Sequence, residues 1–397
     1  MPVLALTANQ LFTPLDVIEE GIVVVEDRMI RAVGPRKTIT VPSSARVVEL
    51  GDKILAPGFI DVHIHGGAGH DVMEGTPEAV QAVARSVLQH GTTSFLPTTL
   101  SAPPDMLLQS LAGLRTILAS WKARPGEPMA EPVGIHLEGP FISAECRGAH
   151  PQAHLQNPSV QLLQQCLDAA GGFARILTLA PELPGALDLL HYAAARGVRV
   201  ALGHSAATYQ QAMQAIEAGA RHAVHVFNAM RPLHHRDPGI LGAVLTDDRV
   251  TAEVIADGVH VAPPALRLLA RCKGGSGTVL VTDAVSATGM SPGRYFLGGM
   301  EISLGDDPRT GLPCCRNREG ALAGSVLTQD RAVRNMVAMA GVSLQDAVRM
   351  ASYNPARLLG LEERKGSLRE GADADLVVLH PDGTVVGAMA QGLANFL

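Results

Sequence analysis

Residues that can bind a metal ion occur along much of this chain, and the first of them are His63 and His65. They stand two positions apart in the stretch GFIDVHIHGG, where Ile60, Val62 and Ile64 alternate with them as in a buried strand. Side chains at positions i and i+2 of a strand lie on one face, roughly 6 to 7 Å apart, so two imidazoles can reach one ion. The spacing predicts a metal-binding pair.

Four further residues of this kind follow other short apolar segments. Glu138 ends VGIHLEGP, His204 ends VRVALGHS, His225 lies in HAVHVFNAM and Asp283 follows GTVLV. Singly, each has an ordinary explanation as a hydrogen-bonded structural histidine, a carboxylate held by backbone donors or a helix cap. Burying all six groups without a cation would leave several polar atoms unpaired, at roughly 1 to 3 kcal/mol each. Together they predict one metal site with nitrogen and oxygen ligands.

The elements that must position these residues alternate regularly. From Gly58 onward, eight short apolar segments alternate with helix-like segments such as residues 76–90. Strand then helix, eight times, predicts an α/β fold, a TIM-type (β/α)8 barrel, whose active site lies at the carboxyl ends of its strands. We expect the barrel to span residues 58–360 with a β-hairpin insertion at about 290–320, and residues 1–57 and 361–397 to form one small β domain.

Composition excludes several kinds of partner. The 397 residues are 47% hydrophobic and 3% aromatic with a formal net charge of -6, which argues against nucleic acid and against a charged membrane surface. No apolar run reaches the roughly 18 residues of a membrane span, and the first residues lack the positive region of a signal peptide. We therefore expect a cytoplasmic protein. Its five cysteines, odd in number and without CxxC spacing, predict reduced thiols.

Nine motifs resemble those of the amidohydrolase superfamily and, within it, the family of N-acetylglucosamine-6-phosphate deacetylases. In chain order they are PGFIDVHIHGG, GIHLEGPF, GAH, GHS, HVFNAM, HRDPG, DGVH, TDAVSATG and LAGS. HxH and TDA are shared across the superfamily, whereas HLEGPF with HVFNAMRP and HRDPG is more specific. Many superfamily members bridge two metals with a carboxylated lysine near the fourth strand. The lysines of this chain lie outside the apolar strand segments, and Glu138 can take that role.

The resemblance implies a metal-dependent hydrolysis that releases acetate from an acetamide. It implies that Glu138, His204 and His225 hold one divalent ion, Zn or Fe, which lowers the pKa of water toward roughly 7 and so produces hydroxide. Asp283 is then the general base and acid. His150, in GAH, is expected to hold the oxyanion, although it could equally well only end a loop.

A second ion is expected as well, because this chain keeps the histidine pair that some family members lack. His63, His65 and Glu138, with Asp283 beside them, would hold it, so that each subunit binds one or two metals.

The substrate implied is a small sugar phosphate, and its phosphate must be bound without a P-loop. Arg236, in HHRDPG, and His260 are the expected donors, although Arg236 could be a solvated loop arginine. In some family members this arginine reaches across a dimer interface, which implies a homodimer. The other residues expected at the substrate are Ala149, Asn228, Ala229, Asp257, Leu322, Ala323 and Gly324.

Three alternatives stay open. The first is the same chemistry on N-acetylgalactosamine-6-phosphate, which differs in the orientation of one hydroxyl. The second is another amidohydrolase, such as an N-acyl-amino-acid deacylase, which the lysine positions and HHRDPG disfavour. The third is a non-catalytic scaffold, which would have no need for Glu138, His204, His225 and Asp283.

Overall fold

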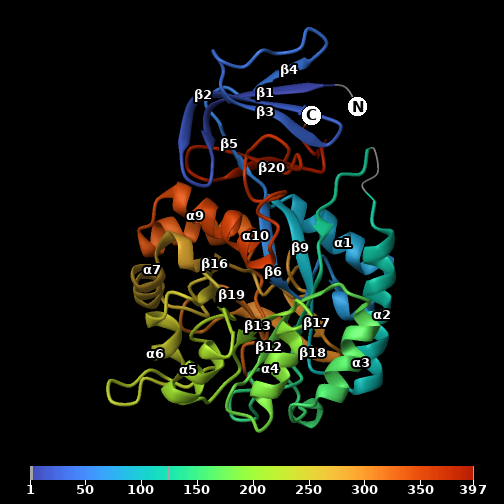
Figure 1. The fold of residues 1–397 in the computed structure, drawn as a ribbon, viewed down its shortest axis with the longest axis vertical. Helices are drawn as coiled ribbons and strands as arrows, with labels where there is room; N and C mark the ends of the chain where they lie inside the picture. Colours follow the sequence, from blue (N-terminus) through green and yellow to red (C-terminus); the bar gives the residue numbers. More distant parts are fainter. Residues whose placement is uncertain (1–2, 123–125, 397) are drawn as a thin grey trace.

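The larger part of the structure, a computed structural model that describes residues 3–122 and 126–396, is a barrel of parallel strands (Figure 1). It confirms the predicted (β/α)8 fold, and each predicted apolar segment contains one barrel strand. The strands are β6 (Phe59–Ile64), β9 (Thr92–Thr99), β11 (Ile135–Glu138), β12 (Ala174–Leu179), β13 (Arg199–Leu202), β14 (His222–Ala223), β15 (Thr251–Val254) and β16 (Thr278–Leu280).

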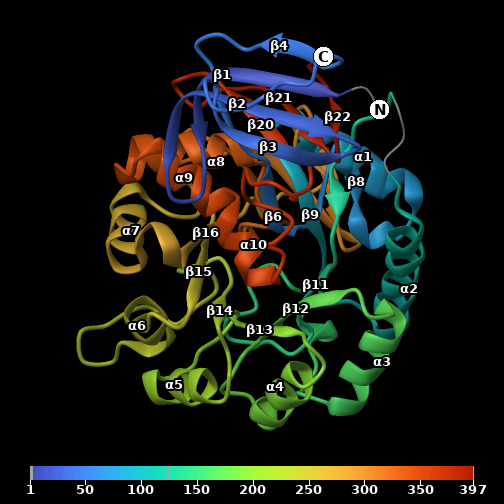
Figure 2. The ribbon, with the colours of Figure 1, turned by 45° about the horizontal axis from the view of Figure 1, so that its top comes forward.

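Helices follow the barrel strands and surround them, as Figure 2 shows. The first of them begins at a clear signal, because Thr76 accepts a hydrogen bond from the amide of Ala79 and Pro77 occupies the first helical position. The helices are α1 (Pro77–Leu88), α2 (Pro104–Ser120), α3 (Val160–Ala170), α4 (Ala186–Ala194), α5 (Tyr209–Glu217), α6 (Gly239–Thr246), α7 (Pro263–Gly277) and α8 (Gln329–Asn335), then α9 (Leu344–Ala351) and α10 (Tyr353–Leu359).

The barrel closes where its first and last strands meet. Neighbouring strands pair in parallel from β6 through β9 and β11 to β16, and a short strand, β10 (Glu131–Pro132), also pairs with β9. Ile64 bridges to Ala284, and the amide of Asp283 donates to the carbonyl of His63 over 2.9 Å. These closing contacts bring two residues of the predicted metal site together, although 220 positions of sequence separate them.

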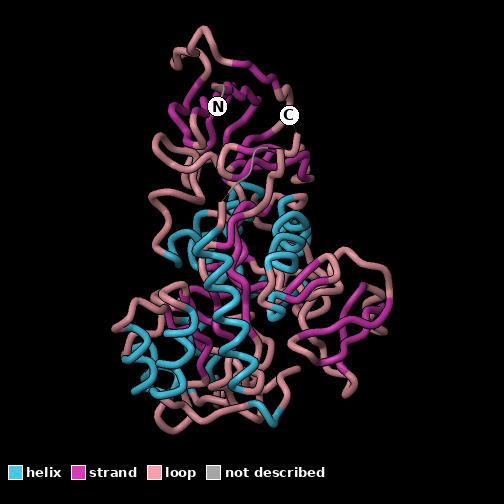
Figure 3. The backbone as a smooth tube through the Cα atoms, turned by 90° about the vertical axis from the view of Figure 1, so that its right-hand side faces the viewer, coloured by secondary structure: helices cyan, strands magenta, loops and turns pink. Residues whose placement is uncertain are grey.

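A second sheet joins both ends of the chain. Its strands are β1 (Leu4–Phe12), β2 (Val17–Glu26), β3 (Met29–Pro35), β4 (Arg46–Glu49), β5 (Ile54–Pro57), β20 (Leu376–Leu379), β21 (Val385–Ala390) and β22 (Leu393–Ala394). The two chain segments meet where β5 pairs antiparallel with β20. Figure 3 shows both termini at this end of the molecule. We propose that residues 1–57 and 361–397 form one small β domain.

The insertion after β16 contains more strands than a hairpin. It is an antiparallel sheet of β17 (Gly293–Leu297), β18 (Met300–Asp306) and β19 (Pro313–Asn317). Leu297 and Cys315 of this sheet pack against Leu100 and Ala149 of the loops that follow β9 and β11. All five cysteines are unpaired. Among the described residues, none of the helices has the length and apolar character needed to cross a lipid bilayer.

Candidate active site

A cavity of about 240 Å³ lies at the carboxyl ends of the barrel strands. Its wall contains twelve of the residues singled out in the sequence, from seven different strand ends or loops: His65, Glu138, Ala149, His150, His204, His225, Asn228, Ala229, His260, Asp283, Leu322 and Gly324. Most of the predicted site residues therefore share one cavity.

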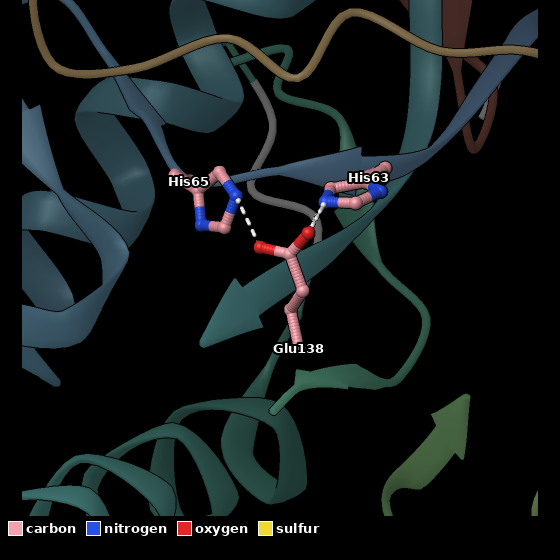
Figure 4. A group of neighbouring side chains, drawn as sticks. All are labelled: His63, His65 and Glu138. Carbon is pink, nitrogen blue, oxygen red and sulfur yellow. Dashed lines mark ion pairs between the residues drawn. The ribbon is translucent and has the colours of Figure 1, made fainter. Parts of the chain in front are cut away.

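Glu138 lies at the centre of the polar groups. One carboxylate oxygen, Oε1, is 3.1 Å from His204 Nε2, 3.0 Å from His225 Nε2 and 3.2 Å from His63 Nε2. The other, Oε2, is 3.2 Å from His65 Nε2. Figure 4 shows the two histidines of β6 and the loop after it on either side of this carboxylate. Burial alone would raise the pKa of Glu138, but the charge of His63 and the imidazole hydrogen bonds hold it well below its ordinary range.

Three of these imidazoles use Nδ1 for a contact outside the cavity and turn Nε2 toward Glu138. His204 Nδ1 donates to the carbonyl of Cys146 over 2.9 Å, and His65 Nδ1 donates to the carbonyl of Thr98 over 3.0 Å. His63 Nδ1 lies 2.9 Å from a carboxylate oxygen of Glu253. Burial would lower the pKa of His63 and His65, but the carboxylates that face them raise it, to about 9 for His65 and well above its ordinary value for His63, so both rings are protonated without a metal. Because Nδ1–H is the donor in each case, a bound cation would take the place of the Nε2 proton and meet a lone pair there.

Imidazole nitrogens this close to a carboxylate fit a cation between them. His204 Nε2 and His225 Nε2 are only 3.0 Å apart, and the buried Nε2 of His63 has no hydrogen-bond partner among the described residues. Nitrogen ligands at about 2.0–2.1 Å from a tetrahedral ion lie roughly 3.3 Å from one another. Three groups of the described side chains have suitable spacing, namely His63, His65 and Glu138, then Glu138, His150 and His204, and also His63, His136 and Glu253. The donor set fits a divalent metal, with Glu138 common to the first two groups.

His150 has the opposite tautomer and is not a suitable ligand, although it belongs to the second group. The backbone amide of Ser101 donates to His150 Nδ1 over 3.3 Å, so Nδ1 is the acceptor and Nε2 carries the proton. Nε2 lies 3.3 Å from Glu138 Oε2 and faces the cavity. Burial lowers the pKa of His150 to about 4, which keeps the ring neutral near pH 7. His150 therefore presents a hydrogen-bond donor.

Asp283 faces the same group of residues from the last strand. Its Oδ1 lies 3.2 Å from His65 Nε2 and 3.8 Å from His63 Nε2. Burial would raise the pKa of Asp283, but the hydrogen bond with His65 and the charges of both histidines hold it below its ordinary value. Asp283 thus remains a carboxylate, able to accept a proton.

The backbone is strained where the site is built. His204, His225 and Asp283 have φ values of 46°, 27° and 50°, in the left-handed region that side chains other than glycine rarely adopt. Such conformations cost on the order of 1–3 kcal/mol each and persist where the surroundings hold them. At these strand ends the strained backbone turns three side chains toward one point.

The residues expected at the substrate lie at different distances from the cavity. His260 lines it, while Asp257 lies behind the wall and binds His260 Nδ1 over 2.6 Å. Ala323 is fully buried beside the wall. Arg236 is outside the wall, on the exposed loop before α6 that projects from the barrel in Figures 1 and 2, and its guanidinium contacts His235 over 2.8 Å.

Several residues around the site were missed in the sequence. Leu100, Gly148, Leu297 and Ala321 line the cavity, and their types carry no chemical signal. Glu253, which holds His63, had a signal, because it is an acidic residue inside the apolar strand segment TAEVIA.

Comparison with known proteins identifies the family of this chain. Residues 54–394 match the amidohydrolase family. The chain belongs to the amidohydrolase family. It is 44% identical over 343 residues to N-acetylglucosamine-6-phosphate deacetylase from Bos taurus, covering 83% of this chain and 80% of the relative. It is also 40% identical over 392 residues to N-acetylgalactosamine-6-phosphate deacetylase from Escherichia coli O157:H7, covering 98% and 99%.

Among solved structures, this amidohydrolase resembles a mutant of N-acetyl-D-glucosamine-6-phosphate deacetylase from Mycobacterium smegmatis in complex with N-acetyl-D-glucosamine-6-phosphate. The TM-score is 0.90 at 36% identity, and 99% of each chain is covered. The likeness extends over both the barrel and the sheet formed by the chain ends.

Proposed function

We propose that this chain hydrolyses the acetamide of N-acetylglucosamine-6-phosphate to glucosamine-6-phosphate and acetate. The observation that carries the proposal is Glu138, surrounded by imidazole nitrogens in a cavity that also contains Asp283 and the donor His150. Amidohydrolase relatives that act on this substrate, according to their names, support the choice of reaction.

The donor set supports one or two divalent ions, with Zn or Fe as the candidates. We assign Glu138, His204 and His225 to one ion, and His63 and His65, sharing Glu138, to a second. When bound, such an ion supplies a Lewis acid that polarises the amide carbonyl and lowers the pKa of water.

The remaining steps belong to side chains of this chain. Asp283 takes a proton from water while the water oxygen bonds to the carbonyl carbon. His150 donates its Nε2 proton in a hydrogen bond to the oxyanion that forms. Asp283 then passes its proton to the amide nitrogen as the C–N bond breaks, because a free amide anion is a poor leaving group. The products are the amine and acetic acid, which loses its remaining proton to water and leaves as acetate.

For the phosphate, we assign His260 from within the cavity and Arg236 from a second copy of the chain. Arg236 lies outside its own cavity wall on an exposed loop, which suits a contact made across a homodimer. Asp257 orients His260. The sugar would contact Ala149, Asn228, Ala229, Leu322, Ala323 and Gly324. The unpaired cysteines support a cytoplasmic location for the reaction.

N-acetylgalactosamine-6-phosphate is the second candidate substrate. One relative named for it aligns with nearly the full length of this chain at 40% identity. The two sugars differ in one hydroxyl, and either amide could occupy the same position beside Asp283.

Acetate release tests the proposal. Purified protein would be analysed for metal and assayed on both sugar phosphates side by side, with an N-acyl amino acid as the control substrate. We expect bound metal, loss of activity on chelation, and the higher kcat/KM on N-acetylglucosamine-6-phosphate. A higher value on the galacto epimer would reassign the substrate. Metal-loaded protein that releases acetate from neither sugar would refute the function.

A further inference from the structure

Glu253, in β15, is a fully buried carboxylate that none of the proposed chemical steps uses. Its exposed fraction is 0%, and it contacts three groups of the barrel interior. Oε2 lies 2.9 Å from His63 Nδ1 and accepts the backbone N–H of His225 over 3.2 Å. Oε1 lies 2.8 Å from His222 Nε2. A buried carboxylate needs such donors. Two of them, the ring of His63 and the amide of His225, belong to residues of the proposed metal site.

The contact with His63 determines which nitrogen that ring offers. With Nδ1–H donated to Glu253, the nitrogen that faces Glu138 at 3.2 Å is Nε2, which would offer its lone pair to a cation that replaces its proton. Figure 4 shows one nitrogen of His63 toward Glu138 and the other turned away from it. His65 and His204 donate instead to backbone carbonyls. Of these three imidazoles, His63 alone is held by a carboxylate, a stronger acceptor that makes the ring a better ligand.

We propose that Glu253 is a positioning residue that makes His63 a ligand for the second metal ion, and so decides whether the site holds two ions or one. This inference rests on the proposed function, since it concerns the same site. Glu253 acts through His63 and does not line the cavity. The same carboxylate oxygen also accepts the amide of His225, so Glu253 connects His63, assigned to the second ion, with His225, assigned to the first.

Two substitutions separate the hydrogen bond from the charge. Glu253→Met removes both oxygens while keeping an unbranched chain. Glu253→Gln can keep its oxygen toward His63 and turn its NH2 toward His222. His222 Nδ1 meets Thr251 Oγ1 at 2.7 Å, so His222 can adopt the tautomer that accepts at Nε2 and donates to Thr251. Glu253→Gln is therefore the conservative variant expected to rescue binding in part.

Asp61 provides a matched control. It is a second fully buried carboxylate of the barrel, on the strand that carries His63, but it contacts Thr282 and the backbone amide of His63 instead of its ring. Asp61→Asn removes a carboxylate from the same interior and leaves the His63 Nδ1 partner in place.

The test is calorimetric titration of the metal-free full chain with Zn²⁺, with acetate release measured on the same preparations. We expect two ions per wild-type chain and two for Asp61→Asn. For Glu253→Met we expect one tight ion and a second weakened by about 10- to 100-fold or more, with Glu253→Gln between the two. Co²⁺ loading, followed by its visible absorption, reports the geometry of each ion without turnover.

Several outcomes would overturn the inference. They are Glu253→Met binding two ions as tightly as wild type, Glu253→Met losing both ions equally, and Asp61→Asn losing the second ion just as the Glu253 variants do. If Glu253→Met does not fold, unchanged affinity in Glu253→Gln overturns it too. Wild type that binds a single ion and releases acetate refutes this inference but not the function. Two ions that depend on Glu253, without acetate release, refute the function but not the inference.

Discussion

His150 and His204 present the same ring nitrogen to the two oxygens of Glu138 but in opposite protonation states. His204 Nδ1 donates to the carbonyl of Cys146, whereas His150 Nδ1 accepts from the amide of Ser101. Their Nε2 atoms lie 3.1 Å and 3.3 Å from the carboxylate. One is therefore a lone-pair ligand and the other a proton donor, a difference made by the groups behind each ring, which for His150 include the Ser101 hydroxyl at 2.8 Å as well as the Ser101 amide.

This difference predicts separate consequences for the two residues. His150→Ala should lower kcat by about 10²- to 10³-fold, the usual effect of removing one oxyanion donor, while metal content stays at the wild-type value. His204→Ala should lose metal as well as activity. Kinetics with elemental analysis of both variants checks this, and metal loss in His150→Ala would make that residue a ligand instead.

Asp283→Asn should keep metal and substrate but lose most turnover. The amide is nearly the same shape as the carboxylate, but it cannot take a proton from water, and general base catalysis contributes typically 10²- to 10⁴-fold. Steady-state kinetics and binding of the intact substrate to the metal-loaded variant give the measurement. A kcat close to wild type would remove the base assignment.

Arg236→Ala should raise KM for N-acetylglucosamine-6-phosphate by roughly 10- to 100-fold, the value of a charge-assisted hydrogen bond. Activity on unphosphorylated N-acetylglucosamine should hardly change. Arg249→Ala is the matched control, because Arg249 is a similarly exposed arginine that is paired with Glu217 and Asp247. Equal losses on both sugars in Arg236→Ala would exclude a phosphate contact.

Lys365 joins the barrel to the sheet of the chain ends. Its buried ammonium lies 2.7 Å from Glu131 of β10 and 2.6 Å from Asp375, next to β20. Lys365→Met should lower the free energy of unfolding by about 3–5 kcal/mol, because it leaves buried carboxylates without their cation. Lys37→Met, at a side chain that is 88% exposed, should change it by less than about 0.5 kcal/mol. Urea denaturation of both variants measures these free energies. Equal denaturation midpoints for the two variants would contradict the prediction.

His136 makes stability depend on pH. Burial, followed by the charge of His63, lowers the pKa of this ring from 6.5 to about 3. Between these values the unfolded chain binds the proton and the folded chain does not, so this contribution to the free energy of unfolding falls as the pH falls. The slope approaches about 1.4 kcal/mol per pH unit for one proton. In denaturation series between pH 6.5 and 4, the free energy of unfolding of His136→Gln should fall with pH less steeply than that of wild type, by up to this amount. Parallel curves for the two proteins would contradict the assignment.

Much of the fold and most of the cavity could be predicted because the signals are local. Apolar segments such as VRVALGHS show both the strand and the residue at its end, and parallel strands bring such ends to one face. Glu253 was missed although its strand was recognised, because nothing in the chain near it indicates that its partner is the ring of His63, 190 positions away. The third strand of the insertion and the contact of Leu297 with the cavity were missed for the same reason.

The sequence by itself determined the alternation of strands and helices, and hence which ligand types gather at the mouth of the barrel. The tertiary structure alone decided which nitrogen each imidazole offers, because a tautomer depends on the group behind the ring: Cys146 for His204, Ser101 for His150 and Glu253 for His63. It also placed Arg236 outside its own cavity. Barrel closure brings these groups together from distant segments, and the direction of a hydrogen bond exists only once both of its partners are in place.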